Sequence, residues 1–366
     1  MAARAAHLDT PARRVAVLGA GGFIGSHLVP ALLARPDREV EAVDYTLDKL
    51  GPVPGAESRL RRRLARIDEP GLLEELTARC DTVVSLTAIC TPALYNQDPL
   101  AVIDASYTDL LPLVKLCTAR RRWLLHLSTC EVYGRMALDQ DGQPTVHMNE
   151  ESTGMFLGPV HRERWSYAAA KALLERVIWA HGRHRGLPFT LVRPFNVIGP
   201  RMDFVPGIDG EGVPRVLASF MSALLRDEPL PLVDGGHQRR SFVSAAEFVD
   251  GLLRILDRPA ASHGEVFNLG NPANDVSVRE LGEALRATYA RVVPQAPLPP
   301  LREVTAEELY GPGYDDSLER VPDIDKARRL LGWQPATSLL QMLPEIVEDY
   351  VCRYAPRLRT ARAVVR

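Results

Sequence analysis

The chain has 366 residues, of which 46% are hydrophobic and 25% are charged, as is ordinary for a globular protein with a large core. Its formal net charge of −2 gives no general attraction to nucleic acid or to an anionic membrane. No run of about 18 apolar residues occurs, and the N-terminal stretch lacks an apolar core, so we expect neither a membrane span nor a signal peptide. The five scattered cysteines contain no Cys-x-x-Cys pair, which argues against a metal site or a disulfide framework and favours a reducing, cytoplasmic location.

Strand-like and helix-like segments alternate through the first 200 residues, a pattern typical of a parallel α/β sheet. Beyond residue 200 the sequence becomes richer in Gly and Pro, and Ser277 and Glu280 have the capping-box spacing that marks a helix start. In chain order we expect strands at 13–20, 39–44, 81–88, 123–129 and 189–199, and helices at 26–34, 100–117, 165–184, 276–289 and 337–351.

A glycine-rich turn joins the first expected strand to the first expected helix. The stretch VLGAGGFIG places Gly19, Gly22 and Gly25 where backbone N–H groups at a helix start can face a pyrophosphate. Asp44 ends the second strand, where a carboxylate accepts adenosine ribose hydroxyls and repels a 2′-phosphate, which favours NAD over NADP. The alternative is a structural turn without a ligand, but the strand–turn–helix context favours the cofactor. We interpret the basic run 59–66 as a solvated face rather than a phosphate site.

These features predict an α/β fold, a Rossmann-type doubly wound parallel sheet with a smaller C-terminal substrate-binding lobe. The NAD-binding domain is expected over residues 12–200, with part of 232–275 returning to it. The substrate-binding lobe is expected over residues 201–356 and is interleaved with the first domain rather than separated from it by a linker.

Tyr167 and Lys171 lie four residues apart on an expected helix, and therefore on one face of it. A cation beside a phenol stabilises the phenolate, so we expect Lys171 to lower the pKa of Tyr167 toward the range of a general base. A surface pair is the ordinary interpretation of this spacing. The glycine turn upstream, and the hydroxyl of Ser128 or Thr129 at a strand end, favour the catalytic interpretation.

These motifs resemble the extended short-chain dehydrogenase/reductase family. RPFNVIGPR at 193–201, GVPRVLASF at 212–220, LVDGGHQRRSF at 232–242, FNLGNP at 267–272, YGPGYDD at 310–316 and LGWQP at 331–335 are similar, in this order, to the UDP-glucuronic acid decarboxylases. Four further stretches most resemble the UDP-apiose/UDP-xylose synthases of that group. They are AICTP at 88–92, STCEVYG at 128–134, RWSYA at 164–168 and the long loop at 199–218.

The resemblance implies tightly bound NAD, the substrate UDP-glucuronic acid, and a homodimer formed through the helices around 100–118 and 165–185. Oxidation at C4 gives a β-keto acid that loses CO₂, and the resulting UDP-4-keto-xylose leads to UDP-xylose or, through retro-aldol cleavage of C2–C3, to UDP-apiose. The partition between these products, or release of the ketone itself, stays open.

Two alternatives are less favoured. A 4-epimerase or 4,6-dehydratase would leave Arg320 without a carboxylate to bind, and a catalytically silent NAD-binding scaffold protein would be expected to lack Tyr167 or Lys171.

The motifs and the resemblance together assign three sets of site residues. The catalytic set is Thr129, Cys130, Glu131, Tyr167, Lys171, Arg320 and Cys90. The cofactor-binding set is Gly19, Gly22, Phe23, Ile24, Gly25, Asp44, Asp68, Leu86, Ala88, Tyr167, Lys171 and Pro194. The substrate-binding set is Tyr95, Arg164, Asn196, Arg201, Arg215, Tyr314, Asp316 and Arg320.

The resemblance gives these residues particular roles. Thr129 bonds the 4-hydroxyl of the sugar, Glu131 moves protons at C5 or repels the carboxylate, and Arg320 orients that carboxylate, although the local pattern alone suggests a surface charge. Cys90 and Cys130 serve as acid and base at C2 and C3, because a thiol pKa is close enough to neutrality to exchange protons. The alternative is that both cysteines are small buried side chains with a packing role only.

The other three cysteines, Cys80, Cys117 and Cys352, are expected to be structural. Pro231 stands where relatives often have a lysine near the nucleotide, and Arg239 and Arg240 are its expected replacements.

Overall fold

The computed structural model describes residues 11–139, 141–311, 314–317 and 319–364. The first ten residues, for which no signal peptide is expected, lie outside the described residues. No helix in the described part of the chain is long and apolar enough to cross a membrane. Within the same residues, no group of three or more His, Cys, Asp or Glu side chains could hold a metal ion.

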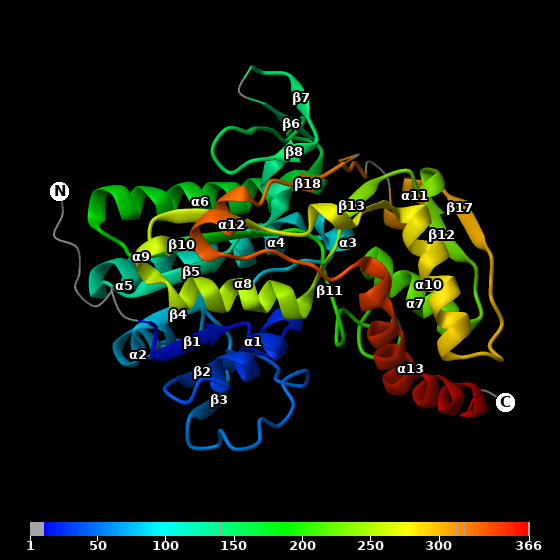
Figure 1. The fold of residues 1–366 in the computed structure, drawn as a ribbon, viewed down its shortest axis with the longest axis horizontal. Helices are drawn as coiled ribbons and strands as arrows, with labels where there is room; N and C mark the ends of the chain where they lie inside the picture. The colour runs from blue at the N-terminus through cyan, green and yellow to red at the C-terminus, as the bar shows by residue number, and fades with distance from the viewer. Residues whose placement is uncertain (1–10, 140, 312–313, 318, 365–366) are drawn as a thin grey trace.

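A seven-stranded sheet forms the centre of the molecule, and every neighbouring pair of its strands is parallel (Figure 1). The strand order is β15-β10-β5-β4-β1-β2-β3, so the direction of winding reverses between β1 and β4. Open α/β sheets bind their ligands at such a reversal, outside the carboxyl ends of the strands. The strands are β1 (Arg14–Leu18), β2 (Glu39–Asp44), β3 (Leu60–Leu64), β4 (Thr82–Ser85), β5 (Trp123–Leu127), β10 (Phe189–Pro194) and β15 (Glu265–Leu269).

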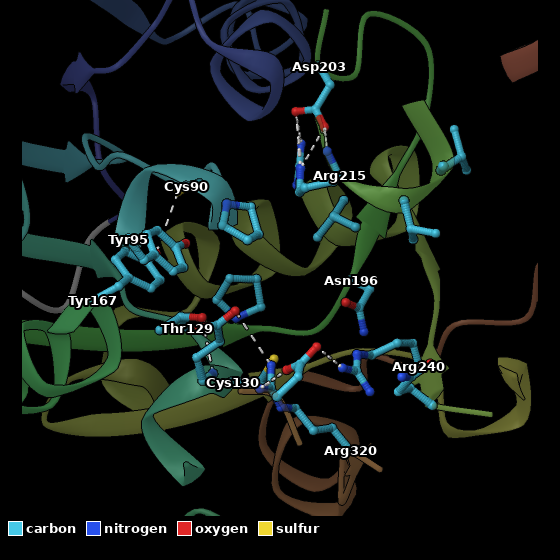
Figure 2. Close-up of a pocket in the computed structure, with 18 of the residues that line it drawn as sticks. Cys90, Tyr95, Thr129, Cys130, Tyr167, Asn196, Asp203, Arg215, Arg240 and Arg320 are labelled. Carbon is cyan, nitrogen blue, oxygen red and sulfur yellow. Dashed lines mark hydrogen bonds and ion pairs between the residues drawn. The ribbon is translucent and has the colours of Figure 1, made fainter. Parts of the chain in front are cut away.

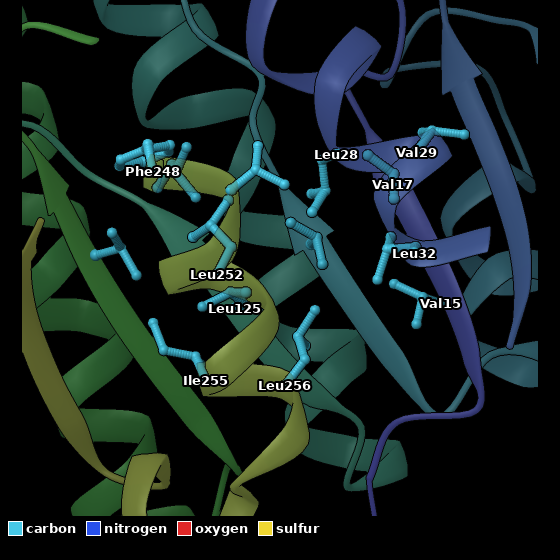
Figure 3. Close-up of a cluster of buried hydrophobic side chains, with 14 of the residues drawn as sticks. Val15, Val17, Leu28, Val29, Leu32, Leu125, Phe248, Leu252, Ile255 and Leu256 are labelled. Atoms are coloured by element: carbon cyan, nitrogen blue, oxygen red, sulfur yellow. The ribbon is translucent and has the colours of Figure 1, made fainter. Parts of the chain in front are cut away.

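Helices cover both faces of this sheet because alternate strand residues point to opposite sides. Val15 and Val17 of β1 pack against α1 (Phe23–Leu33) and α8 (Ala245–Asp257), whose apolar faces meet there (Figure 3). Ala16 and Leu18 point the other way, toward α2 (Leu72–Arg79), α5 (Leu111–Arg120) and α6 (Ser166–Arg185). The predicted Rossmann-type doubly wound fold is therefore confirmed.

A second core lies at the C-terminal side of the chain, on the right of Figure 1. It is built from α7 (Val216–Arg226), α10 (Val278–Val292) and α13 (Leu339–Val364). Beside these helices, β12 (Leu230–Val233) pairs in parallel with β17 (Leu301–Val304). The capping box predicted for α10 is confirmed, because the Ser277 hydroxyl accepts from the Glu280 N–H and the Glu280 carboxylate accepts from the Ser277 N–H.

Short elements surround the carboxyl edge of the main sheet. A three-stranded sheet of β7 (Pro144–Thr145), β6 (Met136–Leu138) and β9 (Gly154–Phe156) projects at the top of Figure 1. The remaining strands are β8 (His147–Met148), β11 (Val197–Ile198), β13 (Arg239–Ser241), β14 (Val243–Ser244), β16 (Asp275–Ser277) and β18 (Val321–Pro322). The remaining helices are α3 (Pro92–Gln97), α4 (Pro99–Ser106), α9 (Pro259–Ser262), α11 (Ala306–Tyr310), α12 (Asp325–Leu331) and the 3₁₀ turns Thr108–Leu110, Cys130–Tyr133, Glu163–Trp165, Asp234–Gly236 and Pro272–Asn274.

The single helix predicted over 100–117 is wrong. The chain forms α4, then the 3₁₀ turn Thr108–Leu110, then α5, and the break falls at Tyr107, whose φ and ψ of −138° and −64° are not helical. Pro112 explains the break, because proline lacks an N–H for the preceding turn and is tolerated in the first turn of a new helix. The basic run forms the edge strand β3, where Arg63 pairs with Glu69 and Glu75 at the surface, so the predicted solvated face is confirmed.

A buried ion pair ties α6 to the main sheet. Arg193 of β10 and Glu175 of α6 are joined by two hydrogen bonds of 3.0 and 2.6 Å, and both side chains are less than a tenth exposed. Arg193 also donates to the Tyr133 hydroxyl at 2.8 Å, and that hydroxyl donates to Asn268 of β15. This network thus links four elements, namely α6, β10, β15 and the 3₁₀ turn Cys130–Tyr133.

Breaking this pair from one side should destabilise the fold strongly. Glu175→Ala leaves a buried guanidinium without its carboxylate, and we expect the free energy of unfolding to fall by about 3–5 kcal/mol. The matched control is Glu75→Ala, which breaks a surface ion pair with Arg63 and should cost several times less. Chemical denaturation of both variants measures the difference, and equal losses would contradict the account.

Candidate active site

A cavity of about 1440 Å³ opens at the carboxyl edge of the main sheet, between the sheet and the C-terminal core. Figure 2 shows side chains from both sides converging on it, with Tyr167 and Thr129 on the sheet side and Arg215 and Arg240 on the other. The cavity lies where the strand order reverses, as expected for a ligand site in this type of fold.

The glycine turn at one end of the cavity has the shape that a dinucleotide requires. Gly19 has a φ of +86°, which only glycine adopts readily, and a Cβ on Gly25 would lie 2.3 Å from the Gly19 carbonyl oxygen. The Asp44 carboxylate accepts from the N–H groups of Gly21 and Tyr45, at 2.9 and 2.8 Å, and burial raises its pKa despite these bonds. The turn therefore leaves room for a close approach of a pyrophosphate to its backbone.

Most of the predicted cofactor residues line the cavity. They are Gly19, Gly22, Phe23, Ile24, Gly25, Leu86, Ala88, Tyr167, Lys171 and Pro194. Asp44 stands behind the turn rather than on the cavity wall. Asp68 does not line the cavity either, since its half-exposed carboxylate pairs with Arg66 at 3.1 Å. The roles of all the residues in the predicted cofactor-binding set stay predictions.

Tyr167 is buried at the cavity wall and stacks on Tyr95, with ring centroids 4.9 Å apart and an interplanar angle of 15°. Its hydroxyl lies 3.5 Å from the Cys90 Sγ atom. Burial, together with Cys90 and Tyr95, raises the pKa of Tyr167 well above 10. A pKa lowered toward the range of a general base is therefore not found for Tyr167, because these raising effects prevail, and the Lys171 ammonium donates to the Leu127 carbonyl oxygen at 2.9 Å.

Arg164 is the centre of a buried charge cluster beside Tyr167. It donates two hydrogen bonds to the Glu131 carboxylate, at 2.6 and 3.1 Å, and Arg320 lies 3.6 Å from the same carboxylate. Burial would raise the pKa of Glu131, but these two guanidinium groups lower it, so the carboxylate is ionised at neutral pH. Arg320 is only 3% exposed, which excludes the surface charge that the local sequence pattern suggested.

Asp316 is the second anion of the cluster. It contacts Arg240 at 2.7 Å and both Arg164 and Arg320 at 3.4 Å. Burial would raise the pKa of Asp316, but the three guanidinium groups hold it at about 2. Within this cluster, three guanidinium groups thus meet two carboxylates.

Two buried donors of this cluster have no hydrogen-bond partner in the described structure, namely the Nε atoms of Arg164 and Arg320. Buried polar groups in folded proteins almost always have partners. These unpartnered donors, in a cluster with more guanidinium than carboxylate groups, are an arrangement suited to recognition of a carboxylate.

Aromatic rings pack against the charge cluster. The Arg164 guanidinium lies over the rings of Tyr95 and Tyr314, at 5.1 and 5.7 Å from their centroids, and Tyr314 stacks on Tyr310 at 4.2 Å. Tyr310 lines the cavity, and burial raises its pKa to about 12. Sequence reasoning missed Tyr310; its four-residue spacing from Tyr314 was the available signal.

The two cysteines assigned to the site both line the cavity. Cys130 is buried and lies beside Arg320, and burial raises the pKa of its thiol even though this guanidinium opposes the shift. The argument from a near-neutral thiol pKa is therefore wrong for Cys130, which is a protonated thiol at neutral pH. Thr129 precedes it, and the Thr129 hydroxyl accepts from the Glu131 N–H at 3.1 Å.

Three residues of the predicted substrate-binding set, Asn196, Arg201 and Arg215, are only partly brought together. Arg215 lines the cavity and is fixed by Asp203, which accepts from its Nε and Nη2 atoms at 2.8–3.1 Å (Figure 2). Asn196 also lines the cavity. Arg201 does not, because its side chain contacts Ser26 and His27 of α1.

Pro231 lies on the cavity wall as well, and so does Arg240, one of its two proposed replacements. Arg239, the other replacement, pairs with Asp275.

Comparison with known proteins identifies the family to which the chain belongs. Residues 15–270 match the NAD dependent epimerase/dehydratase family, and the chain belongs to this family, whose cofactor is NAD. This confirms the resemblance to the extended short-chain dehydrogenases/reductases.

Among curated relatives, the chain is 43% identical to the UDP-D-apiose/UDP-D-xylose synthase of Oryza sativa subsp. japonica, over 93% of this chain and 91% of the relative. It is 42% identical to UDP-D-apiose/UDP-D-xylose synthases 1 and 2 of Arabidopsis thaliana, over 95% of this chain and 93% of each relative.

Solved structures agree with the fold. The PbgP3 protein of Burkholderia pseudomallei is 33% identical, with a TM-score of 0.82 over 94% of this chain and 98% of that chain. The UDP-glucuronic acid 4-epimerase of Bacillus cereus, crystallised with UDP-glucuronic acid and NAD, is 22% identical with a TM-score of 0.75 over 93% of this chain and all of that one, and this supports the fold alone.

The glycine turn generates a prediction about the cofactor. Gly25→Ala places a Cβ 2.3 Å from one backbone oxygen and 2.6 Å from the Ala20 Cα atom, so the backbone of the turn must shift from the shape that the cofactor is expected to need. We expect the purified variant to lose at least 90% of its bound NAD while it remains folded, an estimate from the loss of one close backbone contact.

Gly51→Ala is the matched control, because a Cβ there meets no atom within 4 Å. Release of the nucleotide by denaturation, followed by chromatography, measures the NAD content, and a thermal melt reports the fold. Equal NAD content in the two variants would contradict the assignment.

Proposed function

We propose that this protein is an NAD-dependent decarboxylase that converts UDP-glucuronic acid, through UDP-4-keto-xylose, to UDP-apiose and UDP-xylose. The observation that carries the proposal is the buried Arg320 at the wall of a cavity that also holds Tyr167. A guanidinium group with an unpartnered donor is suited to a sugar carboxylate, which an epimerase or dehydratase that acts on a neutral sugar does not have to bind. The identity of 42–43% with curated synthases over nearly the whole chain supports the same conclusion.

The first step is oxidation of the sugar at C4. When bound, NAD supplies the group that accepts a hydride from C4 and later returns it. Tyr167 takes the proton of the 4-hydroxyl, and the Thr129 hydroxyl holds that oxygen in place. Because burial raises the pKa of Tyr167, formation of the phenolate depends on the positive charge of Lys171 one helical turn away.

The second step is loss of CO₂. The C5 carboxylate is β to the new ketone, so the electrons of the breaking carbon–carbon bond pass to the C4 oxygen as an enolate. Arg320 orients the carboxylate, and the ionised Glu131 beside it disfavours a bound anion and favours departure as neutral CO₂. Protonation of C5 then gives UDP-4-keto-xylose.

The branched product requires an acid and a base at C2 and C3. Deprotonation of the 2-hydroxyl cleaves C2–C3, and re-closure at C4 forms the apiose skeleton. Cys130 is suited to donate a proton in this branch, since burial keeps its thiol protonated. Cys90 contacts the Tyr167 hydroxyl and is placed to exchange a proton with it.

We further propose a cytoplasmic homodimer. The five cysteines are all free, as is usual in a reducing compartment. The large hydrophobic side chains of Leu100, Leu173 and Trp179 are 45–72% exposed on α4 and α6, the region that the family resemblance assigns to the dimer contact. Burial of such side chains against a second copy would remove them from water.

Incubation with UDP-glucuronic acid tests the central reaction. The purified protein with bound NAD should release CO₂ and form a UDP-pentose. Arg320→Gln should lower kcat/KM by about 100-fold or more, because it removes a charged contact to the reacting carboxylate. Arg328→Gln on α12 is the control, since Arg328 pairs with Asp325 at the surface and should leave the rate unchanged. No CO₂ from NAD-loaded protein would contradict the proposal.

Product analysis by NMR tests the role of Cys130. Cys130→Ser should lower the ratio of UDP-apiose to UDP-xylose by about tenfold, as expected for loss of one acid/base group. Cys117→Ser, at an equally buried cysteine far from the cavity, should not change the ratio. An unchanged ratio in Cys130→Ser would return this thiol to a packing role. Formation of UDP-xylose or UDP-4-keto-xylose alone by the unmodified protein would restrict the function to decarboxylation.

A further inference from the structure

Lys171 is held from the side opposite the cavity by groups that the proposed mechanism does not use. Its side chain is 1% exposed, and its Nζ atom lies 2.9 Å from the Leu127 carbonyl oxygen and 3.4 Å from the His126 Nε2 atom. An ammonium group has three N–H donors, so two are directed toward β5. The third remains for the cavity that Lys171 lines.

The hydrogen bonds around His126 define its tautomer. A protonated lysine can only donate, so the Nε2 atom of His126 must accept, and the ring proton is on Nδ1. Nδ1 lies 3.2 Å from the Ser85 hydroxyl oxygen, which accepts a hydrogen bond from this N–H group. Ser85 of β4 and His126 of β5 are direct partners in the parallel sheet, so the sheet register itself places the two side chains together.

We propose that His126, fixed in its Nδ1–H tautomer by Ser85, is a positioning residue that holds the Lys171 ammonium at the cavity wall, one helical turn from Tyr167. The inference rests on the proposed function for its role in the reaction. It goes beyond that function because neither the site residues predicted from the sequence nor the reaction steps above include His126 or Ser85.

His126 is needed because burial works against the charge on Lys171. Burial lowers the pKa of Lys171 to about 8, while Cys90 and Glu175 oppose the change. Burial and the neighbouring Lys171 also lower the pKa of His126 well below 6.5, so the imidazole is neutral and able to accept at working pH. The titratable groups that face Lys171 are Cys90 from the segment after β4, His126 from β5, and Tyr167 and Glu175 from α6, of which Glu175 is paired with Arg193 of β10.

A hydrogen bond to the charged form of a group raises the pKa of a base. Removal of the His126 acceptor should therefore lower the pKa of Lys171, so that less of it is protonated at a given pH. Activity that requires the ammonium would then be lost at a lower pH than in the unmodified protein.

Direct titration of Lys171 is feasible because the chain contains four lysines, Lys49, Lys115, Lys171 and Lys326. The holoenzyme labelled with ¹⁵N-lysine gives four Nζ signals, and Lys→Arg variants assign them. In His126→Leu the midpoint for Lys171 should fall by about one pH unit. At pH 8 this reduces the protonated fraction, and with it the activity, by about fivefold. His126→Gln, whose side-chain oxygen can accept, should restore the midpoint.

Ser85→Ala removes only the group that fixes the tautomer and should give a smaller shift in the same direction. Thr77→Val, which removes an equally buried hydroxyl on α2, is the control for a general loss of packing and should not move the midpoint. An unchanged Lys171 midpoint in His126→Leu overturns the inference. If that variant does not fold, Ser85→Ala decides in its place, with a lowered midpoint in support and an unchanged one against.

The titration does not depend on turnover, so the two proposals fail separately. No release of CO₂ from the unmodified protein would overturn the proposed function and leave the midpoint to decide the role of His126. Normal release of CO₂ with an unchanged midpoint would overturn only the role of His126.

Discussion

The site depends on one buried guanidinium group, that of Arg164. It joins Glu131, which follows β5, to Asp316, which is 152 residues away from Arg164 in the chain, and it lies between the rings of Tyr95 and Tyr314. A charge this deeply buried is stable only when nearby carboxylates and hydrogen bonds offset the cost of its burial. The contacts that stabilise Arg164 therefore bring four separate chain segments to one wall of the cavity, next to Tyr167.

The carboxyl edge of the main sheet forms one wall of the same cavity. The strand order of this sheet reverses beside the glycine turn, so the cofactor region and the carboxyl end of β5 face the same cavity. The segment that carries Asp316 and Arg320 completes the wall from the C-terminal part of the chain. The glycine turn proposed to bind the cofactor and the arginines proposed to bind the substrate thus meet between the core of the main sheet and the core of the C-terminal helices. Ligand sites are common at such boundaries between two parts of a protein.

Much of the fold and of the candidate site could be predicted from the sequence, because the patterns that indicate them involve residues close together in the chain. The glycine turn, the capping box of α10, and the Tyr167–Lys171 spacing each depend on residues within a few positions of one another. The break at Tyr107 was missed because apolar periodicity continues across it. The pairing of Asp316 with Arg240 and Arg164 depends on tertiary contacts, and the raised pKa of Tyr167 depends on burial, so no local pattern reports them.

The central claim is that the arginine cluster binds the carboxylate of the sugar while Tyr167 faces its 4-hydroxyl. A crystal structure of the Tyr167→Phe variant with NAD and UDP-glucuronic acid tests it directly, since the substrate persists when the tyrosine hydroxyl is absent. The account predicts that the sugar carboxylate lies within hydrogen-bonding distance of Arg320, with C4 next to the ring at position 167. A carboxylate directed away from both Arg320 and Arg164 would contradict it.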